Sequence, residues 1–126
     1  MRFPIDARDR QLEYFDRFDR RLRTMLRALI TDDLIEEHRV RPCGQHSDPL
    51  ERVLNYFRRA PVAGKLAVLN VGHSTPAYGL ASFSGSRGAA PVINKDPVYD
   101  TLNEALHAVF LLRVADLMQA DLEYAQ

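Results

Sequence analysis

The spacing of apolar residues in the first quarter of the chain places the strongest constraint on its fold. Between residues 6 and 30 they recur three and four positions apart, which is the periodicity of one helix face. This stripe consists of Phe15, Phe18, Leu22, Met25 and Leu29. The spacing predicts a long helix over residues 6–30. Because three heptads are short for a coiled coil, we expect this helix to pack within a small domain.

Two shorter helices are predicted next from their start signals. Thr31 precedes the segment DDLIEEHR, residues 32–39, whose acidic first turn is favoured by the helix dipole. Asp48 is the predicted cap of the next helix, with the following proline at the first helical position and Glu51 completing a capping box. Apolar residues on one face then predict a helix over residues 49–59.

The middle of the chain predicts a small β-hairpin. The segments KLAVLNV, residues 65–71, and AYGLASF, residues 77–83, are short and apolar, and glycines lie at or near their ends. Residues 84–97 are rich in Gly, Ser and Pro, so we expect a loop there.

A second long helix is predicted over residues 102–122, after a capping box formed by Thr101 and Glu104. One apolar stripe consists of Leu102, Leu106, Val109, Phe110 and Leu117, and the apolar residues away from it are Leu111, Leu112, Val114 and Met118. A helix that is apolar around so much of its circumference is covered on more than one side. We therefore expect it to pack in its own core and also against a partner. Together the elements predict a mainly helical α+β fold in a single domain spanning residues 1–126.

Two polar side chains on this helix are candidates for the partner interface. Arg113 projects from the middle of the stripe, where a buried guanidinium needs a carboxylate or carbonyl oxygens. The alternative is an arginine whose stem lies on the apolar surface while its charge reaches solvent. His107 lies beside the stripe, as a packed or interface histidine would.

The charge balance limits the classes of partner. The 126 residues include 17 basic and 17 acidic side chains, so the net charge is zero. A dedicated nucleic-acid-binding protein is usually strongly basic, and a chain without net charge tends to associate. The single Cys43 cannot form an internal disulfide, and no apolar run is long enough to cross a membrane. We therefore expect a cytoplasmic protein with no nucleic acid and no membrane among its partners.

The candidate metal-binding and catalytic motifs are incomplete. His38, Cys43 and His46 have the spacing H-x4-C-x2-H, which lacks a fourth ligand and matches no common zinc pattern. The segment GHSTP, residues 72–76, resembles a nucleophile elbow, but its second glycine is missing and its proline blocks the helix that should follow.

Two alternatives nevertheless remain open. One is a self-standing hydrolase that uses Ser74 or His73. The other is a small RNA-binding accessory protein, in which arginines of residues 6–30 contact phosphate and Tyr56 stacks on a base.

Three segments of the chain resemble one known family. They are YFDRFDRR (14–21), LIEEHRVRPCGQHSDPLERVLNYFRRAPVAGK (34–65) and EALHAVFLLR (104–113). In this order they resemble the light subunit of N,N-dimethylformamidase. Residues 71–96 depart from the family pattern, because Gly, Ser and Ala replace an aromatic and acid-rich segment.

The resemblance implies a division of labour between two chains. In that family a large subunit holds a mononuclear iron by tyrosine and glutamate side chains and hydrolyses dimethylformamide to formate and dimethylamine. The light subunit binds the large one in a hetero-oligomer. The resemblance thus implies no catalytic residue, metal or cofactor in this chain, and iron in the large catalytic subunit.

The polar side of the predicted 49–59 helix is then the candidate docking surface. Asn55, Tyr56 and Arg58 are its main candidates, since Tyr and Arg are enriched at interface hot spots. A solvated helix face is the alternative.

Overall fold

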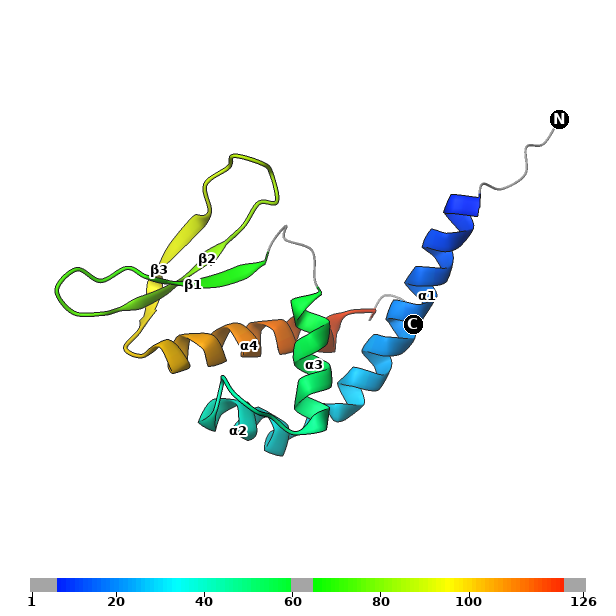
Figure 1. Ribbon diagram of the computed structural model, residues 1–126, viewed down its shortest axis with the longest axis horizontal. Coiled ribbons are helices and arrows are strands. Elements are labelled where there is room, and N and C mark those ends of the chain that lie inside the picture. Colours follow the sequence, from blue (N-terminus) through cyan, green and yellow to red (C-terminus); the bar gives the residue numbers. More distant parts are fainter. Residues whose placement is uncertain (1–6, 60–64, 122–126) are drawn as a thin grey trace.

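The computed structural model describes residues 7–59 and 65–121, which form four helices and one three-stranded sheet (Figure 1). The elements in chain order are α1 (Ala7–Leu29), α2 (Asp32–Val40), α3 (Asp48–Arg58), β1 (Leu66–Asn70), β2 (Tyr78–Ser82), β3 (Val92–Tyr99) and α4 (Leu102–Gln119). The predicted mainly helical α+β fold is confirmed. Each predicted helix is present, with bounds close to those expected from the sequence.

Two of the predicted helix caps are confirmed. The Thr31 hydroxyl accepts a hydrogen bond from the backbone N–H of Leu34 at 3.2 Å. The Thr101 hydroxyl accepts one from the backbone N–H of Glu104 at 3.1 Å. Each bond satisfies an amide that the first turn of a helix otherwise leaves without a partner.

The predicted cap of α3 is wrong. Ser47, and not Asp48, is the N-cap, and its side chain makes no capping bond. The Ser47 hydroxyl instead donates to the carboxylate of Glu37 at 2.6 Å. Asp48 pairs with Arg52 at 2.9 Å. Hydrogen bonds that involve a charged group are stronger than neutral ones. The Ser47 hydroxyl and the Asp48 carboxylate, either of which could have capped the helix, therefore bind Glu37 and Arg52 instead.

The strands form an antiparallel sheet in the order β1-β2-β3. The predicted hairpin of β1 and β2 is confirmed, with Val68 opposite Leu80. The predicted loop over residues 84–97 is wrong in its second half, because residues 92–99 form β3. Pro97 is one of the prolines that contributed to the loop prediction. It is compatible with β3 because an edge strand does not need every backbone N–H for pairing.

Helix α4 is the central element of the fold. It contacts all three strands and also α1 and α2. In Figure 1 the sheet lies beside one half of α4, and α3 crosses near its other half. The helical core consists of Leu26, Leu34, Leu50, Val53, Phe57, Phe110, Val114 and Leu117. This core packs α1, α2, α3 and α4 against one another, and so sets the position of α1 beside α3.

The apolar pattern of α4 is only partly used within the chain. Val114, which lies off the predicted stripe, is buried, whereas Leu102 on that stripe is 46% exposed. Leu111, Leu112 and Met118 are also exposed. Helix α1 behaves similarly, because its N-terminal half extends away from the other helices (Figure 1). In the described part of the chain, no helix is long and apolar enough to span a bilayer.

Candidate functional site

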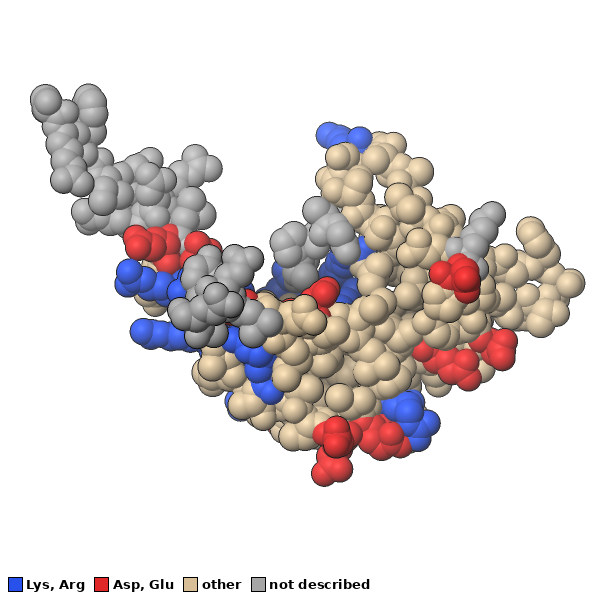
Figure 2. Space-filling view, turned by 180° about the vertical axis from the view of Figure 1, so that it is seen from behind, with Lys and Arg blue, Asp and Glu red and all other residues tan. Residues whose placement is uncertain are grey.

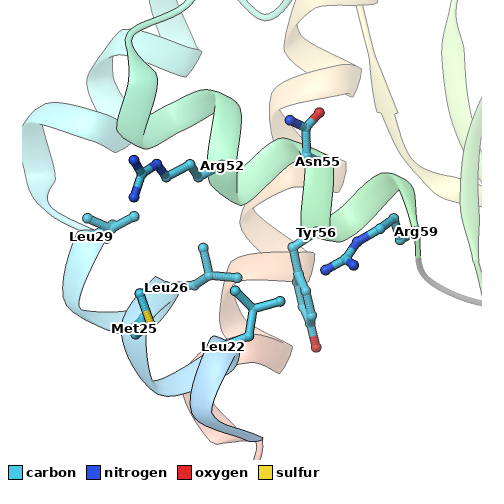
Figure 3. A pocket seen from close by; sticks show the side chains of 8 residues that line it. All are labelled: Leu22, Met25, Leu26, Leu29, Arg52, Asn55, Tyr56 and Arg59. Carbon is cyan, nitrogen blue, oxygen red and sulfur yellow. The ribbon is translucent and has the colours of Figure 1, made fainter. Parts of the chain in front are cut away.

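A groove with a volume of about 270 Å³ lies between α1 and α3 (Figure 3). Its lining residues are Leu22, Met25, Leu26 and Leu29 from α1 and Arg52, Asn55, Tyr56 and Arg59 from α3. One wall is therefore apolar and the other is polar and basic. Two of the three predicted docking residues of the 49–59 helix, Asn55 and Tyr56, line this groove, whereas Arg58 does not.

Tyr56 is the predicted interface residue that enters the groove most directly. Its ring points toward Leu22 in Figure 3 and is half-buried. The guanidinium carbon of Arg59 lies 6.0 Å from the centre of that ring, at the edge of cation–π range. Tyr56 also raises the pKa of Arg23, although the main cause of that shift is the carboxylate of Asp121.

Asn55 and Arg58 are held together on another side of α3. The Asn55 side chain turns away from α1 in Figure 3 and accepts a hydrogen bond from Arg58 at 2.9 Å. Arg58 also lies 3.7 Å from a carboxylate oxygen of Glu51. Of the predicted docking residues on α3, only Tyr56 therefore presents its side chain directly to α1.

A second cavity, of about 220 Å³, lies among α3, α4 and β1. It brings together Arg58 and Arg113, two predicted interface residues from different helices. Arg113 is half-buried and donates to the backbone carbonyl of Leu66 at 3.1 Å. Burial lowers the pKa of this guanidinium. Of the two partners expected for Arg113, the carbonyl is the one present, and the bond joins α4 to β1.

His107, the remaining predicted interface residue, forms a pair with His38. Their Nδ1 atoms are 2.9 Å apart, so one ring donates and the other accepts. The ring of His38 stacks on Phe110, with centroids 3.9 Å apart and planes at 12°. His38 is only 4% exposed. The pair therefore ties α2 to α4 inside the fold.

The environment of this pair favours neutral imidazoles. Burial, followed by the nearby His107 and His46, lowers the pKa of His38 to about 4. Burial is also the main cause that lowers the pKa of His107. Two imidazolium rings could not share a hydrogen bond between their Nδ1 atoms, because each would be only a donor. The contact requires at least one neutral ring.

The three residues weighed as metal ligands take different roles. His46 contacts Glu51 through Nδ1 at 3.2 Å and the carbonyl of Arg41 through Nε2 at 2.7 Å. Cys43 is exposed. Within residues 7–59 and 65–121, no group of three or more His, Cys, Asp or Glu side chains is arranged to hold a metal ion.

The GHSTP segment lies in the connection between β1 and β2. The Asn70 side-chain oxygen shapes this turn by accepting hydrogen bonds from the N–H groups of Gly72 at 3.0 Å and Ala77 at 3.3 Å. His73 and Ser74 are both exposed there. A turn held in this way does not lead from a strand into a helix, as a nucleophile elbow must.

A cluster of charges joins α1 to the end of α4. Arg23 binds Asp121 through two hydrogen bonds of 2.8 and 2.9 Å. Arg27 donates to the carbonyls of Leu117 and Ala120 at 3.1 and 3.2 Å. Helix α4 has no basic residue in its own last turn, so α1 supplies the positive charge that its C-terminus favours. The hydrogen bond from Arg23 is the main cause that lowers the pKa of Asp121.

Uncharged surface is extensive on the side of the molecule that faces away from the viewer in Figure 1. Figure 2 shows it crossing the middle of the molecule over α4, with charged side chains mostly around it. Leu111, Leu112 and Met118 of α4 are 42–46% exposed. Exposed apolar side chains that lie together on one helix are typical of protein–protein interfaces.

These features define a small, mainly helical α+β protein with a basic-edged apolar groove and an uncovered apolar helix face. A model of the N,N-dimethylformamidase alpha subunit family matches residues 13–124. The chain belongs to this family. It is 34% identical over 122 residues to an N,N-dimethylformamidase alpha subunit from Alcaligenes sp, covering 93% of this chain and 90% of that protein. It is 34% identical over 114 residues to the alpha subunit from Paracoccus aminophilus, covering 86% of this chain and 79% of that protein.

Sequence reasoning missed how the polar residues are paired. His38 and His107 were considered separately, as a possible metal ligand and an interface residue, and no spacing rule relates positions so far apart. Asp121 was not singled out at all. The four-residue spacing of Arg23 and Arg27 places both on one side of α1, but it does not identify their acidic partner.

Proposed function

We propose that this chain is the non-catalytic light subunit of a hetero-oligomeric amide hydrolase. In this proposal the enzyme hydrolyses dimethylformamide to formate and dimethylamine at an iron held by a large subunit. The observation that carries the proposal is the match to dimethylformamidase alpha subunits over most of this chain and most of theirs.

The described residues support a docking role for the chain itself. Several polar groups with shifted pKa values join elements of this chain to one another. These contacts are His38 with His107, Arg113 with β1, and Arg23 with Asp121. In contrast, apolar side chains on α1 and α4 remain exposed. In our proposal these surfaces dock on the large subunit and stabilise it.

The proposal includes three further expectations. The iron belongs to the partner, this chain carries no cofactor, and the enzyme works in the cytoplasm. RNA binding is less well supported, because Arg23 and Arg27 of α1 are bound to Asp121 and to carbonyls of α4.

Reconstitution tests the proposal. The chain is expressed alone and together with the large dimethylformamidase subunit of the same organism, and formate release from dimethylformamide is measured with added iron. We expect turnover and bound iron only when the large subunit is present. Turnover by this chain alone above a metal-only control, abolished by Ser74→Ala, would instead establish a self-standing hydrolase.

A further inference from the structure

The apolar wall of the groove continues beyond the part of α1 that α3 covers. Leu22 and Leu29 are half-buried beside α3. Phe15 and Phe18 belong to the same three-and-four spacing but are 57% and 51% exposed. Residues with this spacing share one side of a helix. The stripe therefore runs out of the groove and onto the N-terminal half of α1, the part of the helix that projects in Figure 1.

The opposite rim of the groove carries two arginines whose positive charge is only partly balanced. Arg52 and Arg59 lie seven residues apart on α3, which is roughly 10 Å along a helix. Arg52 pairs with Asp48, but both side chains are more than half exposed, so the pair is weak. Arg59 has no carboxylate within ion-pair distance among the described residues, and no acidic side chain lines the groove.

We propose that this groove and the adjoining stripe of α1 receive an amphipathic helix of the large subunit. The apolar face of that helix lies along Phe18, Leu22 and Met25, and its carboxylates, about two turns apart, bind Arg52 and Arg59. A helix is the matching element, because residues three and four apart form a seam that another helix fills. The inference rests on the proposed function and adds the surface and the chemistry of the contact.

A second copy of this chain fits the groove less well. In a two-fold contact both copies use the same patch, so each copy would bring Arg52 and Arg59 and no carboxylate from the groove lining. Like charges brought together in this way oppose association. An acidic partner segment removes the conflict and supplies the carboxylates that the rim lacks.

Met25→Glu tests the apolar part of the contact. Met25 is 61% exposed, so the substitution should change the melting temperature of the free chain by no more than about two degrees. It places a charge where the partner's apolar face would lie. We expect the dissociation constant for the large subunit to rise by at least about tenfold. Val40→Glu, at a side chain that is 67% exposed on α2, is the matched control and should change nothing.

Charge reversal tests the basic rim separately. The double variant Arg52→Glu, Arg59→Glu should weaken binding of the large subunit by roughly tenfold or more. The same reversal at Arg87, which is exposed between β2 and β3, should have no effect. A photoreactive benzoylphenylalanine in place of Phe18 should crosslink to an acidic helical segment of the large subunit.

The outcomes separate this inference from the proposed function. If the unaltered chain does not bind the large subunit, the proposed function itself fails. If it binds, but Met25→Glu and the double reversal bind equally well, the groove is not the contact. A crosslink from position 18 to a second copy of this chain, with none to the large subunit, would also overturn the inference.

Discussion

Asp121 joins the end of α4 to α1 through its side chain. It has a φ of +68°, in the left-handed region, and it accepts both hydrogen bonds from Arg23. Asparagine tolerates the same backbone conformation, so Asp121→Asn removes the charge and largely spares the turn. We expect a loss of roughly 1–3 kcal/mol in the free energy of unfolding, as for hydrogen bonds to charged groups.

Urea denaturation of the dilute chain measures this loss. Asp116→Asn, at an exposed position on the same helix, is the control and should change the free energy by less than about 0.5 kcal/mol. Equal stability of the two variants would mean that the Arg23–Asp121 contact contributes nothing in solution.

His38 should make the stability of the chain depend on pH. Its pKa is lowered to about 4 in the folded chain, against an ordinary value near 6.5 in the unfolded one. The unfolded chain therefore takes up a proton first, and stability falls as the pH decreases from about 6.5 toward 4. By linkage, this group alone should remove roughly 1–2 kcal/mol between pH 7 and pH 5.

Comparing variants isolates this contribution. His38→Gln keeps a hydrogen-bonding group near His107 but does not titrate, so its unfolding free energy should fall less steeply with decreasing pH. His73→Gln, in the exposed turn after β1, should keep the original slope. If all three chains had the same slope, the neutral state of His38 would not be a source of stability.

At the scale of the elements, Arg113 links the sheet to the helices. Its bond to the Leu66 carbonyl crosses from α4 to β1. Arg113→Met keeps much of the stem and removes the donor, leaving that carbonyl without this partner. We expect a loss of roughly 1–3 kcal/mol in unfolding free energy.

Hydrogen exchange locates the effect of this substitution. The amides of β1 should exchange faster in Arg113→Met, whereas those of α1 should change little. Arg87→Met serves as the control at an exposed position. Unchanged exchange in β1 would show that packing alone holds the sheet on α4.

The helices were predictable because their signals are local. The stripe of α1 and the threonine caps of α2 and α4 each depend on residues within a few turns. Strand β3 was missed because its sequence, VINKDPVY, does not alternate apolar and polar residues. Its described side chains are mostly exposed, with Val92 at 62%, so burial imposes no such pattern. Its pairing with β2 is a tertiary property, and the Gly, Ser and Pro residues nearby indicated a loop instead.

The candidate site was predictable only in part, for the same reason. Residue types indicated the polar side of the 49–59 helix and placed Tyr56 there. They did not show that the Asn55 side chain bonds to Arg58 on the same helix, or that His38 and His107 meet, since the histidine contact joins separate elements. That these residues form a partner interface remains a prediction.

At the scale of the whole molecule, the uncovered apolar surfaces predict association. The chain has no net charge, and apolar residues of α1 and α4 are exposed. Expressed alone, it should self-associate or aggregate at high concentration, whereas the complex with the large subunit should stay soluble. Sedimentation velocity over a concentration series measures this, and a monodisperse monomer throughout would contradict it.

The contact between Arg23 and Asp121 has a consequence for the order of events during synthesis. Its two residues are 98 positions apart in the chain. While α1 emerges from the ribosome, the carboxylate that will neutralise Arg23 has not yet been made. Contacts of such long sequence separation form late, because the intervening chain must first be ordered. This contact between α1 and the end of α4 can therefore form only after translation has passed residue 121, and a message truncated upstream would yield a protein that lacks it.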